Sequence, residues 1–276
     1  MKTRVISGTC FVILMAGFFL LREFVSPLCF TGLIFFFSIC GGIETSRAIS
    51  QKTGAVASYA CLILSIISVP VYMWLSVLFE SSMAYLVFIT ISLLVFIFIV
   101  IYTYLSGAEE NSAIVGGLCS LYPSVFMLSF VYLNDVEGRL GFIALLLVFV
   151  IASLTDTFAY FVGSTLKGKK LCPKLSPKKT WSGAIGGLFG GILGAILIYF
   201  IFNDSLTQFS WWQFIIIGFI GAILDQVGDL FESFIKRFAG IKDMGKIMPG
   251  HGGVMDRLDG VMFVSFAVAV ALIIML

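Results

Sequence analysis

Three acidic side chains recur at helical spacing in one largely apolar stretch of the sequence. Asp225, Asp229 and Glu232 stand at positions i, i+4 and i+7, so in a helix they share one face. An ionised carboxylate in the middle of a bilayer costs at least about 2.5–3.5 kcal/mol unless a cation compensates it. The pattern therefore predicts a salt bridge to another helix or, as we favour, a divalent metal ion bound by carboxylate oxygens.

A second group of acids follows a glycine-rich turn in the segment PGHGGVMDRLD, residues 249–259. Asp256 and Asp259 are three residues apart, with Arg257 between them. Acids at the start of a helix suit its dipole. Acids that can hold a cation beside an arginine that can grip phosphate are also typical of a phosphoryl-transfer site. His251 has no second histidine with which to form a metal site, so we expect it to contact phosphate or to shape the turn.

Basic side chains accompany both acidic groups. Lys236, Arg237 and Lys242 lie between them in the sequence. A charge run beside a membrane also fits interfacial lysines or attraction to anionic lipids. The convergence of acids, glycines and basic residues in one segment favours the binding of phosphate.

An upstream hydrophilic segment has a similar composition. In SPKKT, residues 176–180, two lysines and two hydroxyl groups surround a proline and could hold phosphate oxygens; these are Ser176, Lys178, Lys179 and Thr180. Asp156 and Tyr160 precede them, one helical turn apart, and an acid in that apolar stretch indicates a polar cavity.

The elements that carry these residues are predicted to be membrane-spanning helices. The chain has 276 residues, of which 60% are hydrophobic and 12% are charged, whereas a soluble domain carries about 25% charged residues. Spanning a bilayer takes about 20 apolar residues. Nine runs qualify, at 5–21, 27–43, 55–79, 84–105, 114–133, 140–162, 182–202, 211–231 and 260–276. We therefore expect an all-α integral membrane protein with about nine transmembrane helices, the first being retained rather than cleaved as a signal peptide.

The distribution of basic residues predicts the orientation. With a cytoplasmic N-terminus and nine alternating helices, every lysine and arginine except Arg22 and Arg139 falls on the cytoplasmic side. The C-terminus is then outside. We expect one polytopic membrane domain, 1–276, in which helices within 1–133 form a scaffold. Catalytic helices lie within 140–276, joined by cytoplasmic loops at 163–181 and 232–259.

Six glycines follow one another closely in the seventh predicted helix. They are Gly183, Gly186, Gly187, Gly190, Gly191 and Gly194. Such a stripe could line a substrate groove, but small residues at this spacing are frequent where membrane helices pack closely. We favour packing.

Residues 233–259, SFIKRFAGIKDMGKIMPGHGGVMDRLD, resemble the signature of the CDP-diacylglycerol synthases, also called phosphatidate cytidylyltransferases. The shared pattern runs from S-x-x-K-R through K-D-x-G to P-x-H-G-G-x-x-D-R-x-D. The stretch 156–183, which contains LSPKKTWSG, is also similar to the family. The resemblance covers about the last 120 residues by motif.

The resemblance implies a reaction and roles for the site residues. CTP and phosphatidic acid would give CDP-diacylglycerol and diphosphate, in phospholipid biosynthesis. Asp229 and Asp256 would be the leading metal ligands and catalytic acids, supported by Asp225 and Asp259. The substrate phosphates would be held by Lys236, Arg237, Lys242, His251 and Arg257, with Ser176, Lys178, Lys179 and Thr180 lining the same opening.

The resemblance also implies the cofactor, the partners and the location. Mg²⁺ is the expected metal ion, with a monovalent cation such as K⁺ as a second candidate. Besides CTP and phosphatidic acid, the partners would be membrane lipids and a second copy of the chain in a homodimer, and no nucleic acid. The chain would lie in a bacterial inner or plasma membrane, with its active site facing the cytoplasm.

Two other functions remain open. A CDP-alcohol phosphotransferase would carry D-G-x-x-A-R, whereas Asp259-Gly260 is followed here by VMFV. A cation-coupled transporter could use Asp225 and Asp229, and transporters often consist of two related halves. The polar residues here concentrate in the last 120 residues, without a matching set in the first half.

Overall fold

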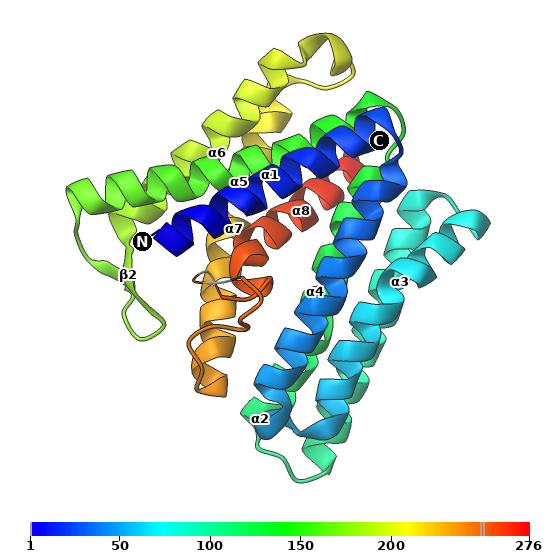
Figure 1. Ribbon diagram of the computed structural model, residues 1–276, viewed down its shortest axis with the longest axis vertical. Coiled ribbons are helices and arrows are strands. Elements are labelled where there is room, and N and C mark those ends of the chain that lie inside the picture. Colours follow the sequence, from blue (N-terminus) through cyan, green and yellow to red (C-terminus); the bar gives the residue numbers. More distant parts are fainter. Residues whose placement is uncertain (1, 249, 251) are drawn as a thin grey trace. The chain divides into compact units, whose positions relative to one another are not determined.

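Helices make up most of the protein in the computed structural model, which describes residues 2–248, 250 and 252–276 (Figure 1). Within those residues, eight helices are long and apolar enough to cross a membrane. They are α1 Lys2–Phe24, α2 Pro27–Leu78, α3 Ser81–Leu105, α4 Glu110–Asp135, α5 Arg139–Leu166, α6 Trp181–Ile201, α7 Trp211–Ala239 and α8 Met255–Met275. The prediction of an all-α integral membrane protein is confirmed.

Helix α2 accounts for the difference between nine predicted spans and eight helices. Its 52 residues would extend about 78 Å, more than twice the roughly 30 Å of a bilayer core. Gly54 has φ 82° and ψ 174°, which breaks the helix. The two parts of α2 correspond to the predicted runs 27–43 and 55–79. Hydropathy could not show that the polar residues between these runs continue the first part as helix.

The chain forms two compact units, to both of which α7 and α8 contribute. The first consists of Met1–Asp135 and Ile235–Leu258. Here α2, α3 and α4 run alongside one another (Figure 1). Small and hydroxyl side chains allow this packing: the Tyr85 hydroxyl lies 2.7 Å from the Ser129 Oγ, and the Ser38 hydroxyl donates to the Ser65 carbonyl. Such pairs satisfy polar groups where no water is available.

The second unit consists of Val136–Phe234 and Asp259–Leu276. In it α5 lies along α6 (Figure 1), with the glycine stripe in the interface. A Cβ atom at Gly190 would come within 2.4 Å of the Leu154 carbonyl oxygen, and one at Gly186 within 2.6 Å of the Val162 Cβ. The glycines therefore allow the two backbones to approach each other, which supports packing as the role of Gly186 and Gly190, while Gly183 also lines a cavity described below.

This packing gives a prediction for Gly190. The change Gly190→Ala should lower the free energy of unfolding by about 1–3 kcal/mol, because the added methyl group meets backbone and not a flexible side chain. Gly17→Ala in α1 is the control, since nothing lies within 4 Å of a Cβ there. Thermal unfolding in detergent measures both variants, and equal midpoints would contradict the prediction.

A short β-hairpin joins α5 to α6 within the loop predicted at 163–181. Strand β1, Lys170–Cys172, pairs antiparallel with β2, Ser176–Thr180, so that Lys170 stands opposite Thr180. At its end the Thr180 hydroxyl accepts a hydrogen bond from the Gly183 N–H at 3.1 Å and caps α6. The hairpin thus holds the lysines of SPKKT at a fixed place beside α6.

Candidate active site

Four carboxylates gather in the second unit, on α5, α7 and α8. Asp225 on α7 is 2% exposed and interacts electrostatically with Asp156 of α5, Asp229 of α7 and Asp259 of α8. Lys179 acts on the same group, and its Nζ lies 2.7 Å from Asp229 Oδ2. The negative charges around the buried Asp225 repel its carboxylate. The cluster is therefore suited to holding additional positive charge.

Two glycines explain how α7 and α8 bring these acids together. A Cβ atom at Gly228 would lie 2.5 Å from the Asp259 carbonyl oxygen, and one at Gly260 would lie 2.4 Å from Asp225 Oδ1. The Asp225 carboxylate thus rests against the backbone of α8. A side chain at either glycine would push the helices apart and separate the acids.

A cavity of about 730 Å³ lies next to this cluster, within the second unit. Its walls come from α5, the hairpin, α6 and α7, and include Asp156, Asp229, Tyr160 and Gln226. Four lysines also line it, namely Lys167, Lys170, Lys178 and Lys179. No acidic residue occurs between Asp156 and Asp204 in the sequence, so these lysines are not neutralised by neighbours along the chain. The cavity can accept a ligand that carries several negative charges.

The structure therefore brings together part of the predicted site. Asp225, Asp229 and Asp259 lie in one cluster, and Lys178, Lys179 and Thr180 line the cavity beside it. Ser176, half-buried at the start of β2, does not contribute to the wall of the cavity.

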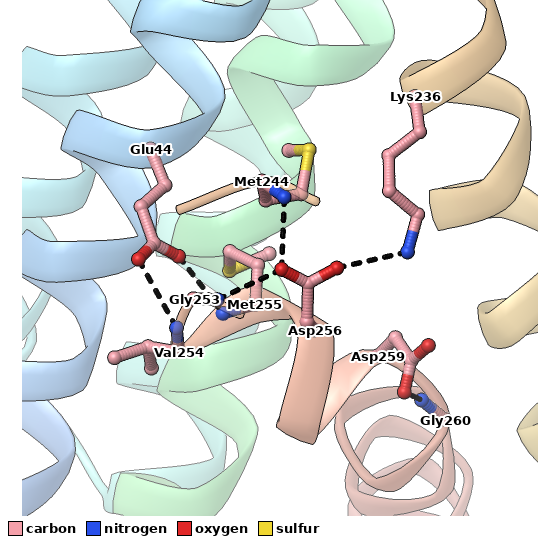
Figure 2. A network of polar contacts seen from close by, with 9 residues as sticks. All are labelled: Glu44, Lys236, Met244, Gly253, Val254, Met255, Asp256, Asp259 and Gly260. Atoms are coloured by element: carbon pink, nitrogen blue, oxygen red, sulfur yellow. Dashed lines mark hydrogen bonds and ion pairs between the residues drawn. The ribbon is translucent and has the colours of Figure 1, made fainter. Parts of the chain in front are cut away.

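The fourth predicted acid, Asp256, belongs to the first unit, where it organises the segment before α8 (Figure 2). Its Oδ1 lies 2.9 Å from the Lys236 Nζ. Its Oδ2 accepts hydrogen bonds from the backbone N–H groups of Met244 and Gly253, both at 2.8 Å. The Asp256 side chain is 5% exposed and that of Lys236 is 14% exposed. This is a well-shielded ion pair with additional backbone donors.

The other predicted phosphate-binding residues also belong to the first unit. Arg237, Lys242 and Arg257 are exposed. His251 lies outside the described residues. The hydrophilic segment 232–259 is helical at both ends, because α7 continues to Ala239 and α8 begins at Met255.

The residues fit a divalent cation by their chemistry. The cluster offers hard carboxylate oxygens, which Mg²⁺ prefers, in surroundings that need positive charge. Among the described residues, no three His, Cys, Asp or Glu side chains are arranged as a ready-made metal site.

Two acids proved more important than sequence reasoning had indicated. Asp156, which we had linked only to a polar cavity, interacts with Asp259 and Asp229 and lines the cavity. Glu44 was missed: the residue is 4% exposed, and its carboxylate accepts two hydrogen bonds from the start of α8. Glu44 directly follows the predicted apolar run 27–43, and a carboxylate at that place in a membrane helix indicates a functional role.

Comparison with known proteins supports the resemblance found in the sequence. The chain is 40% identical over 152 residues to a phosphatidate cytidylyltransferase of Rickettsia conorii, covering 54% of this chain and 64% of the relative. It is 36% identical over 163 residues to the Staphylococcus saprophyticus protein of that name, covering 59% and 61%. For Brucella abortus the values are 42% over 120 residues, covering 44% and 43%. The chain thus spans less than two thirds of the length of these relatives.

A sequence model of the cytidylyltransferase family matches residues 2–275, nearly the whole chain. The family predicted from the motif at 233–259 is therefore confirmed. The match covers the helices long enough to span a membrane, the acidic cluster and the lysine-lined cavity of this chain. The protein is a member of the cytidylyltransferase family.

Proposed function

We propose that the chain is a phosphatidate cytidylyltransferase, which converts CTP and phosphatidic acid into CDP-diacylglycerol and diphosphate. The observation that carries this proposal is the cavity lined by four lysines and by Asp156 and Asp229, which belong to the acidic cluster around the buried Asp225. Relatives named phosphatidate cytidylyltransferase in three bacterial genera support it.

The reaction is a nucleotidyl transfer. An oxygen of the lipid phosphate attacks the α-phosphorus of CTP, a new P–O–P bond forms, and the bond to the β-phosphate breaks to release diphosphate. A phosphate monoester has its second pKa near 6, so at neutral pH the nucleophile is largely ionised already. The site therefore needs no strong general base. It needs to align two anions and to neutralise their repulsion.

The cavity is proposed as the place of the nucleotide. Its 730 Å³ lies within the roughly 300–1,000 Å³ usual for small-molecule sites. Lysines on the hairpin and at the end of α5 would neutralise the triphosphate. Tyr160 could stack its ring on the base of the nucleotide, and the amide of Gln226 could form hydrogen bonds with it.

The carboxylate cluster is proposed as the place of the metal. Asp225 and Asp229 would hold Mg²⁺ together with Asp156 or Asp259, and a monovalent ion such as K⁺ is a second candidate. A bound divalent ion would stabilise the charge that develops on phosphate oxygens. Asp256, the other ligand that the resemblance implies, accepts three hydrogen bonds, which leaves one of its roughly four lone-pair sites for a cation.

The remaining expectations concern the membrane. We propose that the chain lies in a bacterial inner or plasma membrane with its lysine-rich hairpin in the cytoplasm, where the positive-inside rule places such residues. CTP would enter from water and phosphatidic acid from the bilayer. A homodimer is proposed from the resemblance alone.

The direct test uses the purified protein in detergent or liposomes. Labelled CTP, phosphatidic acid and Mg²⁺ should give labelled CDP-diacylglycerol and diphosphate, and omission of Mg²⁺ should abolish product. Absence of product with Mg²⁺, with or without added K⁺, would refute the proposal. A CDP-alcohol phosphotransferase would instead consume CDP-diacylglycerol, and a transporter would move cations across sealed vesicles without cytidylyl transfer.

A second test concerns the lysines of the hairpin. Lys178→Ala should raise the KM for CTP by at least about 10-fold, because a hydrogen bond to a charged group is worth about 1.5–3 kcal/mol. Lys169→Ala is a matched control, since Lys169 is exposed on the same connection and does not line the cavity. Steady-state kinetics at saturating phosphatidic acid measure both variants. An equal effect of the two changes would argue against the cavity as the nucleotide site.

A further inference from the structure

A buried carboxylate of α2 holds the beginning of α8, although the two are 210 residues apart in the sequence (Figure 2). Glu44 is 4% exposed. Its Oε1 accepts a hydrogen bond from the Val254 N–H at 3.1 Å, and its Oε2 accepts one from the Met255 N–H at 3.0 Å. Both oxygens are thus engaged by the backbone at the N-terminal end of one helix.

Two glycines make room for this carboxylate. A Cβ atom at Gly245 would come within 2.1 Å of Glu44 Oε1, and one at Gly253 would come within 2.4 Å of both oxygens. The segment before α8 is therefore folded closely around the Glu44 side chain, because a methyl group at either position would displace the carboxylate from its place.

Asp256 completes the arrangement from the helix itself. It accepts the N–H of Gly253, the residue before Val254, and also the N–H of Met244 and the ammonium group of Lys236. Three successive amides, at 253, 254 and 255, thus point to two carboxylates of the protein. The N-terminal amides of a helix otherwise attract anions such as phosphate.

We propose that Glu44 is a positioning residue for the catalytic segment: by binding the amides of Val254 and Met255 it fixes the start of α8, and hence the Asp256 carboxylate and its partner Lys236. The proposal rests on the function proposed above. The argument is geometric: Asp256 lies in the first turn of α8, so the direction of its side chain depends on the position of the turn that Glu44 holds. A displacement of about 1 Å at a reacting group can cost about 100-fold in rate.

The test compares Glu44→Gln with the unchanged protein. A glutamine keeps the size of the side chain but offers one carbonyl oxygen, and its NH₂ group faces an N–H donor. We expect kcat to fall about 10–100-fold, while the KM values for CTP and phosphatidic acid stay within roughly threefold. Hydrogen exchange of peptides covering 244–258, measured by mass spectrometry, should become faster in the variant.

The first unit offers a matched control. Asp135 is also a carboxylate that accepts two side-chain hydrogen bonds, from the hydroxyl groups of Tyr72 and Ser81, and it makes none with 236–256 among its described contacts. Asp135→Asn should loosen its own surroundings but leave kcat and the exchange of 244–258 unchanged. If it lowers kcat as much as Glu44→Gln does, the effect is general destabilisation and the proposal is wrong.

The remaining outcomes are separable. If Glu44→Gln does not fold, Glu44→Asp, which keeps the charge but is one methylene shorter, should still show faster exchange at 244–258 and a lower kcat. Wild-type behaviour of the variant that folds would overturn the proposal. If the unchanged protein transfers no cytidylyl group, the proposed function fails, whereas the exchange measurement, which needs no substrate, still decides whether Glu44 holds this segment.

Discussion

Replacing Asp229 by asparagine is expected to abolish CTP-dependent conversion of phosphatidic acid, with a loss of at least about 10²–10³-fold in kcat. The change keeps the size of the side chain but removes the charge that faces Lys179 at 2.7 Å. It also takes away an anionic oxygen from the cluster around Asp225, which we propose holds Mg²⁺. The variant should bind the divalent ion more weakly and align the lipid phosphate less well.

The measurement is turnover by purified protein across a range of Mg²⁺ concentrations. Asp204→Asn is the control, because Asp204 is an exposed acid of the same unit in the short helix η1, Asn203–Ser205. That variant should keep full activity. If Asp229→Asn inserts and folds normally and keeps full activity, the proposal that this cluster binds the metal ion is wrong.

The change Asp256→Asn is expected to abolish activity and also to destabilise the fold. It removes the carboxylate charge that lies 2.9 Å from the Lys236 ammonium group, whose side chain is 14% exposed. Removing one member of a buried ion pair costs about 3–5 kcal/mol. Here the loss is expected near the lower end, since asparagine can still accept hydrogen bonds from the backbone N–H groups of Met244 and Gly253.

A double-mutant cycle separates the two effects. Lys236→Met alone should destabilise less, and adding it to Asp256→Asn should recover part of the stability but none of the activity. Thermal unfolding and turnover measure the four proteins, with Glu109→Gln, at an exposed acid of the first unit outside the signature, as the control. Activity retained in Asp256→Asn would show that this carboxylate is dispensable.

The sequence predicted the presence of the helices better than the residues at which they begin, end or break. Long apolar runs are strong signals, because every backbone group in a bilayer must be satisfied within the helix. The break at Gly54 was foreseen only as a gap between two runs, since hydropathy does not report a positive φ angle. The hairpin was missed because its strands are short and its Pro177 lies within β2, which is unusual for a strand.

For the site, the sequence identified residue types but not all of their partners. Asp225 and Asp229 share a face of α7 as their spacing predicted, and the lysines of SPKKT line the cavity beside Asp229. The attachment of Glu44 to α8 could not be predicted, because one sequence does not say which of its acids meet amides far along the chain. The same applies to Asp256, whose hydrogen bonds from Met244, Gly253 and Lys236 depend on how the loop folds.

The link between Glu44 and α8 has a consequence for biosynthesis. Chains are made at about 5–20 residues per second, so the 210 residues between Glu44 and Val254 take about 10–40 s to synthesise. During that interval α2 has left the ribosome while the amides that will hold its carboxylate do not yet exist. The contact between Glu44 and α8 can therefore form only after the last helix has been synthesised.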